Sequence, residues 1–202
     1  MEATRYKHNP IIRPDDVAPS SEALKVVGVF NPAVAQVGEE TILLLRVAEA
    51  ARETDPGYVS VPVVDPASRE VRVVSLPRSS PDVDASDPRL VVHRGRVYLT
   101  SVSHLRIARS RDGCHFQVDI RPALAPATPY ERYGVEDPRI TRIPDGRFIV
   151  SFSAVSEHGV CVELAEARDF AEFRRLGIVL PPENRNVALF PEKIGGRYVM
   201  MH

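Results

Sequence analysis

The chain is built from short apolar segments in which hydrophobic and polar residues alternate with a period of two. Clear examples begin at Thr41 ("TILLLRV"), Tyr58 ("YVSVPVV") and Arg147 ("RFIVSFS"). Such alternation, rich in Val, Ile and aromatic residues, predicts half-buried β-strands. The pattern predicts strands at residues 33–37, 41–47, 58–64, 70–76, 89–93, 96–102, 105–110, 139–143, 147–153 and 160–165.

Helical periodicity is weak throughout the chain. No stretch of 12 or more residues keeps a helical period, and residues 164–177 ("LAEARDFAEFRRLG") come closest. We interpret that stretch as the end of a strand, a turn at 167–170 and the start of another strand. Gly, Pro, Asp and Asn between the apolar segments are typical of turns. The sequence therefore predicts an all-β fold.

Four segments share one arrangement: a proline, an apolar alternation, a Gly-containing turn and a second apolar strand. Their prolines are Pro32, Pro88, Pro138 and Pro191, preceded by Asn31, Asp87, Asp137 and Phe190, so the steps are 56, 50 and 53 residues. A four-stranded unit repeated at this spacing is typical of β-propeller blades. The alternative is a β-sandwich with coincidental hairpins.

Polar residues recur at the start of these units. In a propeller the innermost strand of each blade lines a central channel. Asn31, Asp87 and Asp137 have the same position in the repeat, so we expect their side chains to converge on one cavity. A ring of polar groups in a concave funnel suits a polyhydroxylated ligand.

Composition excludes several classes of partner. The 202 residues carry a formal net charge of -1, so nothing indicates a nucleic acid or a membrane surface as partner. The longest apolar runs are too short to span a bilayer, and the polar N-terminus is not a secretory signal. Two cysteines without a spacing motif, Cys114 and Cys161, indicate a reducing, cytoplasmic setting. No metal-ligand spacing is present, so we expect no metal.

Several motifs together resemble glycoside hydrolase family 130, which contains β-mannoside phosphorylases and β-mannosidases. They are "GVFNPAV" (28–34), "LLLRV" (43–47), "SDPRLVV" (86–92), "YLTSVSHLRIARSRDG" (98–113), "YGVEDPRI" (133–140) and "PPENRNVALFPEKIGGRYVMMH" (181–202). The resemblance implies a five-bladed propeller. On this reading residues 1–202 are one domain, with blade starts near 31, 87, 137 and 190. About three and a half blades are present, as expected of an N-terminal portion.

The resemblance also implies a catalytic acid. It assigns the proton donor of an inverting phosphorylase to Asp137, with the proton passing through a sugar hydroxyl. A phosphorylase needs one acid and cations that hold inorganic phosphate, its co-substrate, whereas hydrolases usually employ two carboxyl groups. Strand alternation predicts that Glu136 and Asp137 point to opposite sides, so that only Asp137 faces the funnel. Glu136 would raise the pKa of Asp137 and Arg139 would lower it.

The other candidate residues follow from the same resemblance. Asn31 and Arg46 resemble the pair that contacts the sugar whose bond is broken, and Asp87 resembles a further hydroxyl-binding carboxylate. The remaining candidates are Ser103 and His104 for the acceptor sugar, Glu136 and Arg139 beside the acid, and Arg185, Lys193 and His202 for phosphate. Guanidinium and ammonium groups both suit phosphate.

Three classes of function stay open. The first is an inverting β-mannoside phosphorylase that uses inorganic phosphate and no other cofactor. The second is a β-mannosidase on the same scaffold, and the third is a non-catalytic carbohydrate-binding propeller or an inactive fragment. The expected partner is a small carbohydrate, and self-association into a homo-oligomer is left open.

Overall fold

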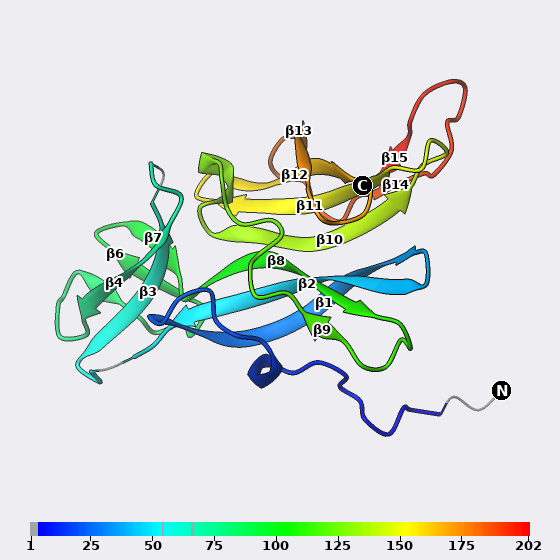
Figure 1. The fold of residues 1–202 in the computed structure, drawn as a ribbon. Helices are drawn as coiled ribbons and strands as arrows, with labels where there is room; N and C mark the ends of the chain where they lie inside the picture. Colours follow the sequence, from blue (N-terminus) through cyan, green and yellow to red (C-terminus); the bar gives the residue numbers. More distant parts are fainter. Residues whose placement is uncertain (1–3, 54, 66) are drawn as a thin grey trace.

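The computed structural model describes residues 4–53, 55–65 and 67–202, and this part of the chain is all-β (Figure 1). Its helical segments are two single-turn 3-10 helices, η1 (Pro14–Asp16) and η2 (Pro129–Glu131). The strands are β1 (Leu24–Val37), β2 (Glu40–Ala51), β3 (Tyr58–Val64), β4 (Val71–Pro77), β5 (Val83–Asp84), β6 (Leu90–His93), β7 (Arg96–Leu99), β8 (Ser101–Ser110), β9 (Gln117–Val118), β10 (Gly134–Arg142), β11 (Phe148–Ser156), β12 (Gly159–Ala167), β13 (Arg174–Leu180), β14 (Ala188–Leu189) and β15 (Met200–Met201). The predicted all-β class is confirmed.

The predicted break in residues 164–177 is also found. β12 ends at Ala167 and β13 begins at Arg174, with Asp169 accepting a backbone hydrogen bond from Ala171 in the turn between them (3.0 Å). The short polar side chain of Asp stabilises such a turn by hydrogen-bonding its own backbone two residues on. Despite its helix-like spacing of apolar residues, this segment therefore forms a strand, a turn and a second strand.

Two sets of antiparallel strands make up most of the fold. The first set is β1-β2-β8 with β9 on the edge of β8, and the second is the meander β10-β11-β12-β13. A single parallel pair, Gly134 with Ser103, connects β10 to β8. β14 and β15 pair with each other beyond the second set. In Figure 1 the two sets lie one above the other, and β3, β4, β6 and β7 form a smaller unit to one side.

The blade start predicted near Asp87 does not begin a four-stranded unit. Residues 89–110 do not form successive strands of one repeat unit, because β6 and β7 form a separate sheet with β5 while β8 pairs with β2. The pairing of β8 runs from Thr41 opposite Ser110 to Ala50 opposite Ser101. Burial explains this choice: β8 is buried along almost its whole length, so it needs neighbours on both edges and cover on both faces.

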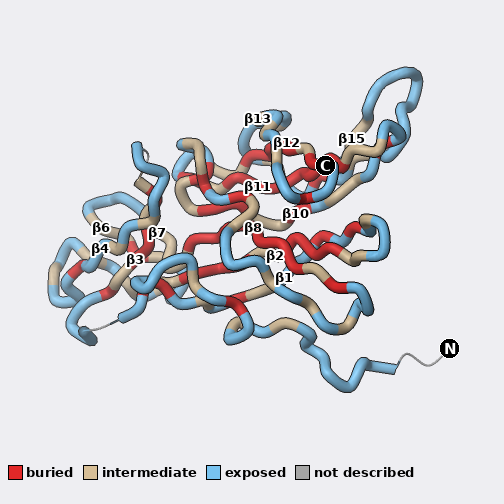
Figure 2. The backbone as a smooth tube through the Cα atoms, in the orientation of Figure 1, coloured by how far each residue is buried: buried red, intermediate tan, exposed pale blue. Residues whose placement is uncertain are grey.

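The main core lies between the two strand sets, where Figure 2 shows buried segments of both. Ile42, Leu44 and Ile107 of the first set belong to the same cluster as Phe148 and Phe152 of the second. Burying one such side chain is worth about 1.5–3 kcal/mol. A second cluster covers the other face of the first set, and a third joins the second set to β14. These contacts fix how the two sets face each other, and thereby how their strands approach at the site.

β1 and β10 each contain the same irregularity. The pairing shifts between Phe30 and Ala33 in β1 and between Glu136 and Arg139 in β10. The residue before the proline has a positive φ in both, 48° at Asn31 and 50° at Asp137. Asn and Asp tolerate this left-handed conformation better than other non-glycine residues, and proline is accommodated at bulges. Two of the four predicted repeat starts, at Asn31 and Asp137, therefore form the same β-bulge.

Candidate active site

The two bulges bring their polar side chains to one arginine on β2. The Arg46 guanidinium donates through Nη2 to Glu136 Oε1 (2.6 Å) and through Nη1 to Asp137 Oδ1 (3.1 Å). Asn31 Nδ2 donates to the same Asp137 oxygen (2.8 Å). The Ser103 hydroxyl lies 3.3 Å from Arg46 Nε and 3.2 Å from Glu136 Oε1. We call Asn31, Arg46, Ser103, Glu136 and Asp137 the Arg46 cluster.

The prediction that Glu136 and Asp137 point to opposite sides is wrong. Both carboxylates contact the same guanidinium group. The bulge is the physical reason: an extra residue and a positive φ at Asp137 break the strict alternation of the strand. The site therefore presents a pair of acids rather than one.

A glycine sets how closely β10 approaches β8. Gly134 has a φ of 127°, and a Cβ built on it would lie 2.5 Å from the backbone nitrogen of Ser103 and 2.7 Å from its carbonyl oxygen. Real Cβ atoms do not come this close, so only glycine fits without a shift of the backbone. This contact places Glu136 within hydrogen-bond reach of the Ser103 hydroxyl.

Phe30 completes the support of Arg46. The Arg46 Cζ atom lies 4.7 Å from the centre of the Phe30 ring, a cation-π arrangement. The ring occupies the space in which a side chain on Gly28 would lie, because a Cβ there would be 2.2 Å from a ring carbon. Sequence reasoning missed Phe30 and Gly28, although both fall in the motif "GVFNPAV".

Burial changes the proton affinity of Glu136. Its pKa is raised above the ordinary value of 4.5, chiefly by desolvation and further by the negative charge of Asp137. The Arg46 charge, the Ser103 hydroxyl and the Arg185 charge oppose this rise. Perturbed pKa values of neighbouring carboxyl groups, with nearby charges that raise and lower them, are typical of sites of acid-base chemistry.

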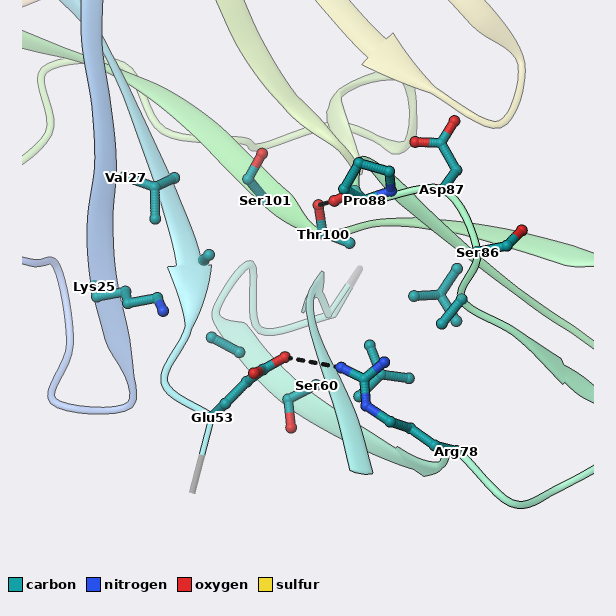
Figure 3. A pocket seen from close by; sticks show the side chains of 15 residues that line it. Lys25, Val27, Glu53, Ser60, Arg78, Ser86, Asp87, Pro88, Thr100 and Ser101 are labelled. Carbon is teal, nitrogen blue, oxygen red and sulfur yellow. Dashed lines mark hydrogen bonds and ion pairs between the residues drawn. The ribbon is translucent and has the colours of Figure 1, made fainter. Parts of the chain in front are cut away.

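An open hollow of about 560 Å³ is lined by residues of β1 and β2, by Ser101 of β8 and by the smaller unit that contains β3 and β6 (Figure 3). Arg46, Ala48 and Ala50 share one face of β2 because side chains alternate along a strand. Ser103 lies opposite Ala48, and Ser101 lies opposite Ala50. Ser101 lines the hollow and is two residues, about 7 Å, from Ser103 of the cluster.

Asp87 lies at the rim of this hollow and not in the Arg46 cluster. Its carboxylate accepts hydrogen bonds from Arg89 Nη2 (2.8 Å) and Nε (3.1 Å). These bonds, together with the Arg89 backbone N–H, lower the pKa of Asp87 to about 2. The structure thus brings together Asn31 and Asp137 but places Asp87 in the turn before β6, where its carboxylate is an ionised acceptor.

His104 lies on the opposite face of β8 from Ser103. It is 4% exposed, with Nε2 at 3.0 Å from Arg106 Nη2 and Nδ1 at 3.6 Å from Glu49 Oε2. Burial and the Arg106 charge lower the pKa of His104 to about 3, so the imidazole is neutral. The structure gives His104 contacts within the first sheet rather than with the cluster. Charged residues inside the apolar strands β2 and β8 were the signal for this buried network.

The four outlying cations have different surroundings. Arg185 lies 3.7 Å from Glu183, and its charge is the smallest of the named influences that lower the pKa of Glu136. The Lys193 ammonium lies 5.1 Å from the centre of the Tyr198 ring. Arg139, Lys193 and His202 are exposed, and the contacts described for residues 4–53, 55–65 and 67–202 do not connect them to the Arg46 cluster.

Metal-ligand clusters and membrane-spanning helices are both absent from the residues that the structure describes. They contain no group of three or more His, Cys, Asp or Glu residues that could hold a metal ion. None of the helices in the same residues is long and apolar enough to cross a membrane.

The fold and the cluster define a class of protein. It is an all-β chain in which two carboxylates and an arginine meet, and such groups are suited to binding the hydroxyl groups of a carbohydrate. Residues 86–202 match the model of glycoside hydrolase family 130, described as beta-1,4-mannooligosaccharide phosphorylase. The chain is also 42% identical, over 206 residues, to the beta-1,2-mannobiose phosphorylase of Listeria innocua. It therefore belongs to glycoside hydrolase family 130.

The extent of these similarities is uneven. The Listeria match covers 100% of this chain and 58% of that protein. The 1,2-beta-oligomannan phosphorylase of a Thermoanaerobacter species is 36% identical over 106 residues, 50% of this chain and 35% of that protein. The solved structure of the Listeria enzyme in complex with beta-1,2-mannobiose superposes with a TM-score of 0.88 over 97% of this chain and 56% of that one. The chain thus spans little more than half the length of the Listeria relative.

Proposed function

We propose that this chain is part of an inverting phosphorylase that cleaves β-mannosides with inorganic phosphate. The observation that carries the proposal is the Arg46 cluster, in which two equivalent bulges place Asn31 beside Asp137, and Asn31 and Arg46 both donate to the same Asp137 oxygen. Family membership supports the same activity. On this proposal the two strand sets are consecutive blades of a five-bladed propeller, and β14 and β15 begin the next.

Asp137 is the proton donor in this proposal. A proton moves from its carboxyl group, through a hydroxyl of the bound sugar, to the glycosidic oxygen. The bond from that oxygen to the anomeric carbon breaks while a phosphate oxygen forms the new bond on the opposite face. The products are an α-mannosyl phosphate and the released sugar. Asn31 and Arg46 hold the sugar that is transferred, since amide and guanidinium groups bind hydroxyl groups in fixed directions.

Inorganic phosphate is the co-substrate and requires cations. Arg185 is the best supported of the proposed ligands, because its charge already acts on Glu136. Lys193 and His202 belong to the same C-terminal segment and are proposed to join it when substrate is bound. Since phosphate is an anionic nucleophile, the reaction needs no second carboxylate as base.

The linkage is proposed to be β-1,2. The family description names β-1,4-linked substrates, whereas both curated relatives above are named for β-1,2-linked ones. The Listeria relative aligns with the whole chain at 42% identity, so the β-1,2 linkage in its name is the better guide to the linkage that this protein would cleave.

One observation favours a second candidate, a β-mannosidase. Hydrolysis usually employs two carboxyl groups, and Glu136 lies beside Asp137 with a raised pKa. In that case Glu136 would activate water. Phosphate dependence separates the two functions, because a hydrolase releases free mannose without phosphate.

The test compares Asp137→Asn, Glu136→Gln and the unchanged 202-residue chain on β-1,2-mannobiose, with and without phosphate. Losing general acid assistance typically costs about 100- to 10,000-fold in rate. We expect Asp137→Asn to lose this factor on mannobiose but less on an aryl mannoside whose leaving group needs little protonation. Asp145→Asn, a turn aspartate paired with Arg147 in the same strand set, is the matched control. Sugar release without phosphate, or a larger loss for Glu136→Gln, contradicts the proposal.

A further inference from the structure

The Arg46 guanidinium group is only partly used by its hydrogen bonds within the cluster. A guanidinium group has five N–H donors in one plane. Nε contacts Ser103 (3.3 Å), Nη1 contacts Asp137 (3.1 Å) and Nη2 contacts Glu136 (2.6 Å), so two of the five donors remain. The side chain is 19% exposed, which leaves room for a ligand. The direction of the two spare donors depends on the orientation of the whole planar group.

Phe30 is placed to restrain that orientation. It lies directly opposite Arg46 in the pairing of β1 with β2, and it is the last paired residue before the bulge. Directly opposite side chains of an antiparallel pair lie close together on one face of the sheet. The Arg46 Cζ atom lies over the Phe30 ring, 4.7 Å from its centre. The hydrogen bonds thus restrain the edge of the guanidinium group, and the ring restrains its tilt.

Gly28 makes room for this ring. It is two residues before Phe30 on the same face of β1. Its φ is not positive, unlike that of Gly134, so the backbone does not require a glycine here. A Cβ on Gly28 would lie 2.2 Å and 2.9 Å from two carbons of the Phe30 ring. The ring that folds back over Gly28 therefore explains why this residue has no side chain.

Phe30 contributes little to the core. It is 38% exposed, and it belongs to none of the four apolar clusters found among residues 4–53, 55–65 and 67–202. An exposed aromatic ring gains less from burial than one in the core. Its contact with Arg46 is therefore the better explanation of its position.

We propose that Phe30 and Gly28 are positioning residues of the active site. The ring, seated over the glycine, holds the Arg46 guanidinium group so that its two spare N–H groups meet hydroxyl groups of the transferred sugar. The ring acts through Arg46 and not by contact with the sugar. This inference rests on the proposed function, in which Asn31 and Arg46 hold that sugar. A cation-π contact at a partly exposed site corresponds to about a two- to fivefold change in an equilibrium constant.

Hydrogen exchange of the Arg46 Nε–H, followed by nitrogen-15 NMR without sugar, tests the positioning directly. The signal is identified by its loss in Arg46→Met. Phe30→Leu should make this exchange about two- to fivefold faster, whereas Phe30→Tyr, which keeps the ring, should leave it unchanged. Gly28→Ala should also make it faster, because the new Cβ displaces the ring, but should add little in the Phe30→Leu background. Tyr58→Leu is the matched control, since Tyr58 is a strand aromatic with a similar exposure of 40% outside the cluster.

Calorimetric titration of the 202-residue chain with β-1,2-mannobiose tests the consequence for the sugar. Phe30→Leu and Gly28→Ala should each bind it about two- to fivefold more weakly than the unchanged chain. Phe30→Tyr and Tyr58→Leu should bind it as the unchanged chain does. Thermal unfolding of each variant checks that a changed affinity comes from a folded protein, and the two weakening substitutions reach the ring by independent routes.

The outcomes separate this inference from the proposed function. Weaker sugar binding with an unchanged exchange rate means that the ring contacts the sugar itself, and it overturns the positioning role. Exchange that is unaltered in both Phe30→Leu and Gly28→Ala overturns it as well, and faster exchange with unaltered affinity overturns the connection from Arg46 to the sugar. If the unchanged chain binds no mannobiose, the proposed function fails, and the exchange rates alone decide whether Phe30 positions Arg46.

Discussion

Replacing Arg46 with methionine is expected to destabilise the protein in a pH-dependent way. Methionine keeps an apolar stem beside Phe30 but removes the charge that faces Glu136 and Asp137. The three side chains are 19%, 19% and 29% exposed, so water compensates only in part for the lost contacts. Hydrogen bonds to charged groups contribute about 1.5–3 kcal/mol each. Because the two bonds to the carboxylates are lost in a half-buried setting, in addition to the weaker one to Ser103, we expect a cost of about 2–4 kcal/mol at pH 7.

The sign of the pH dependence follows from Glu136. Arg46 lowers the pKa of this carboxyl, while burial and Asp137 raise it above 4.5. Without Arg46 the folded-state pKa rises further, so the folded variant binds its proton more tightly than the unfolded chain does. A group of this kind contributes stability at low pH that is lost as pH rises through the folded pKa. The deficit of Arg46→Met should therefore be larger at pH 7 than at pH 4.5.

Urea denaturation followed by circular dichroism at pH 4.5 and 7 measures this deficit. Arg132→Met is the matched control: Arg132 pairs with one carboxylate, Glu157, at 2.8 Å with side-chain exposures of 24% and 33%, and should cost less. Glu136→Gln in the Arg46→Met background should recover part of the loss at pH 7. An equal deficit at both pH values, with additive effects in the double variant, would refute the electrostatic account of the cluster.

Two further predictions concern a close approach and a buried acid. Gly134→Ala should cost at least about 1–3 kcal/mol, because its Cβ meets the Ser103 backbone, whereas Gly95→Ala, with open space around its Cβ, should cost less in the same urea denaturation. Glu163 is 2% exposed, and burial followed by the Glu131 charge raises its pKa to about 7, so ionising it costs at most about 3 kcal/mol. The protein should thus lose stability as pH rises from 4.5 to 7, and Glu163→Gln should be more stable than the unchanged chain at pH 8; equal destabilisation at pH 5 and 8 would contradict this.

Local patterns predicted the strands well, because alternation is a property of a few adjacent residues. The segment beginning at Tyr58 is β3, the segment beginning at Arg147 lies in β11 except for Arg147 itself, and the turn after Ala167 was found. Pairing was harder. β8 pairs with β2 although the strands β3 to β7 lie between them in the sequence. The alternation of "TILLLRV" is compatible with pairing to β8 and equally with pairing to the next strand in the sequence. Only the near-complete burial of β8 decides between them, and burial depends on the assembled fold.

The site shows the same division between what local sequence can and cannot say. The proline spacing located Asn31 and Asp137, and in the structure Asn31 Nδ2 lies 2.8 Å from Asp137 Oδ1. It also included Asp87, which stands in an ordinary turn, because an Asp-Pro pair marks a turn as readily as a bulge. The signal that separates them is position: Asn31 and Asp137 interrupt a long apolar alternation, whereas Asp87 precedes a short strand.

The bulge at Asp137 also changes how the acid should be assigned. Regular alternation would hide Glu136 from the sugar and leave one candidate. Since both carboxylates meet Arg46, removing either one changes the charge that the other experiences. A loss of activity in Asp137→Asn is therefore informative only beside Glu136→Gln, and only with a substrate that needs little protonation. If Asp137 delivers the proton, that substrate is spared in Asp137→Asn; if Asp137 merely positions Arg46, both substrates slow together.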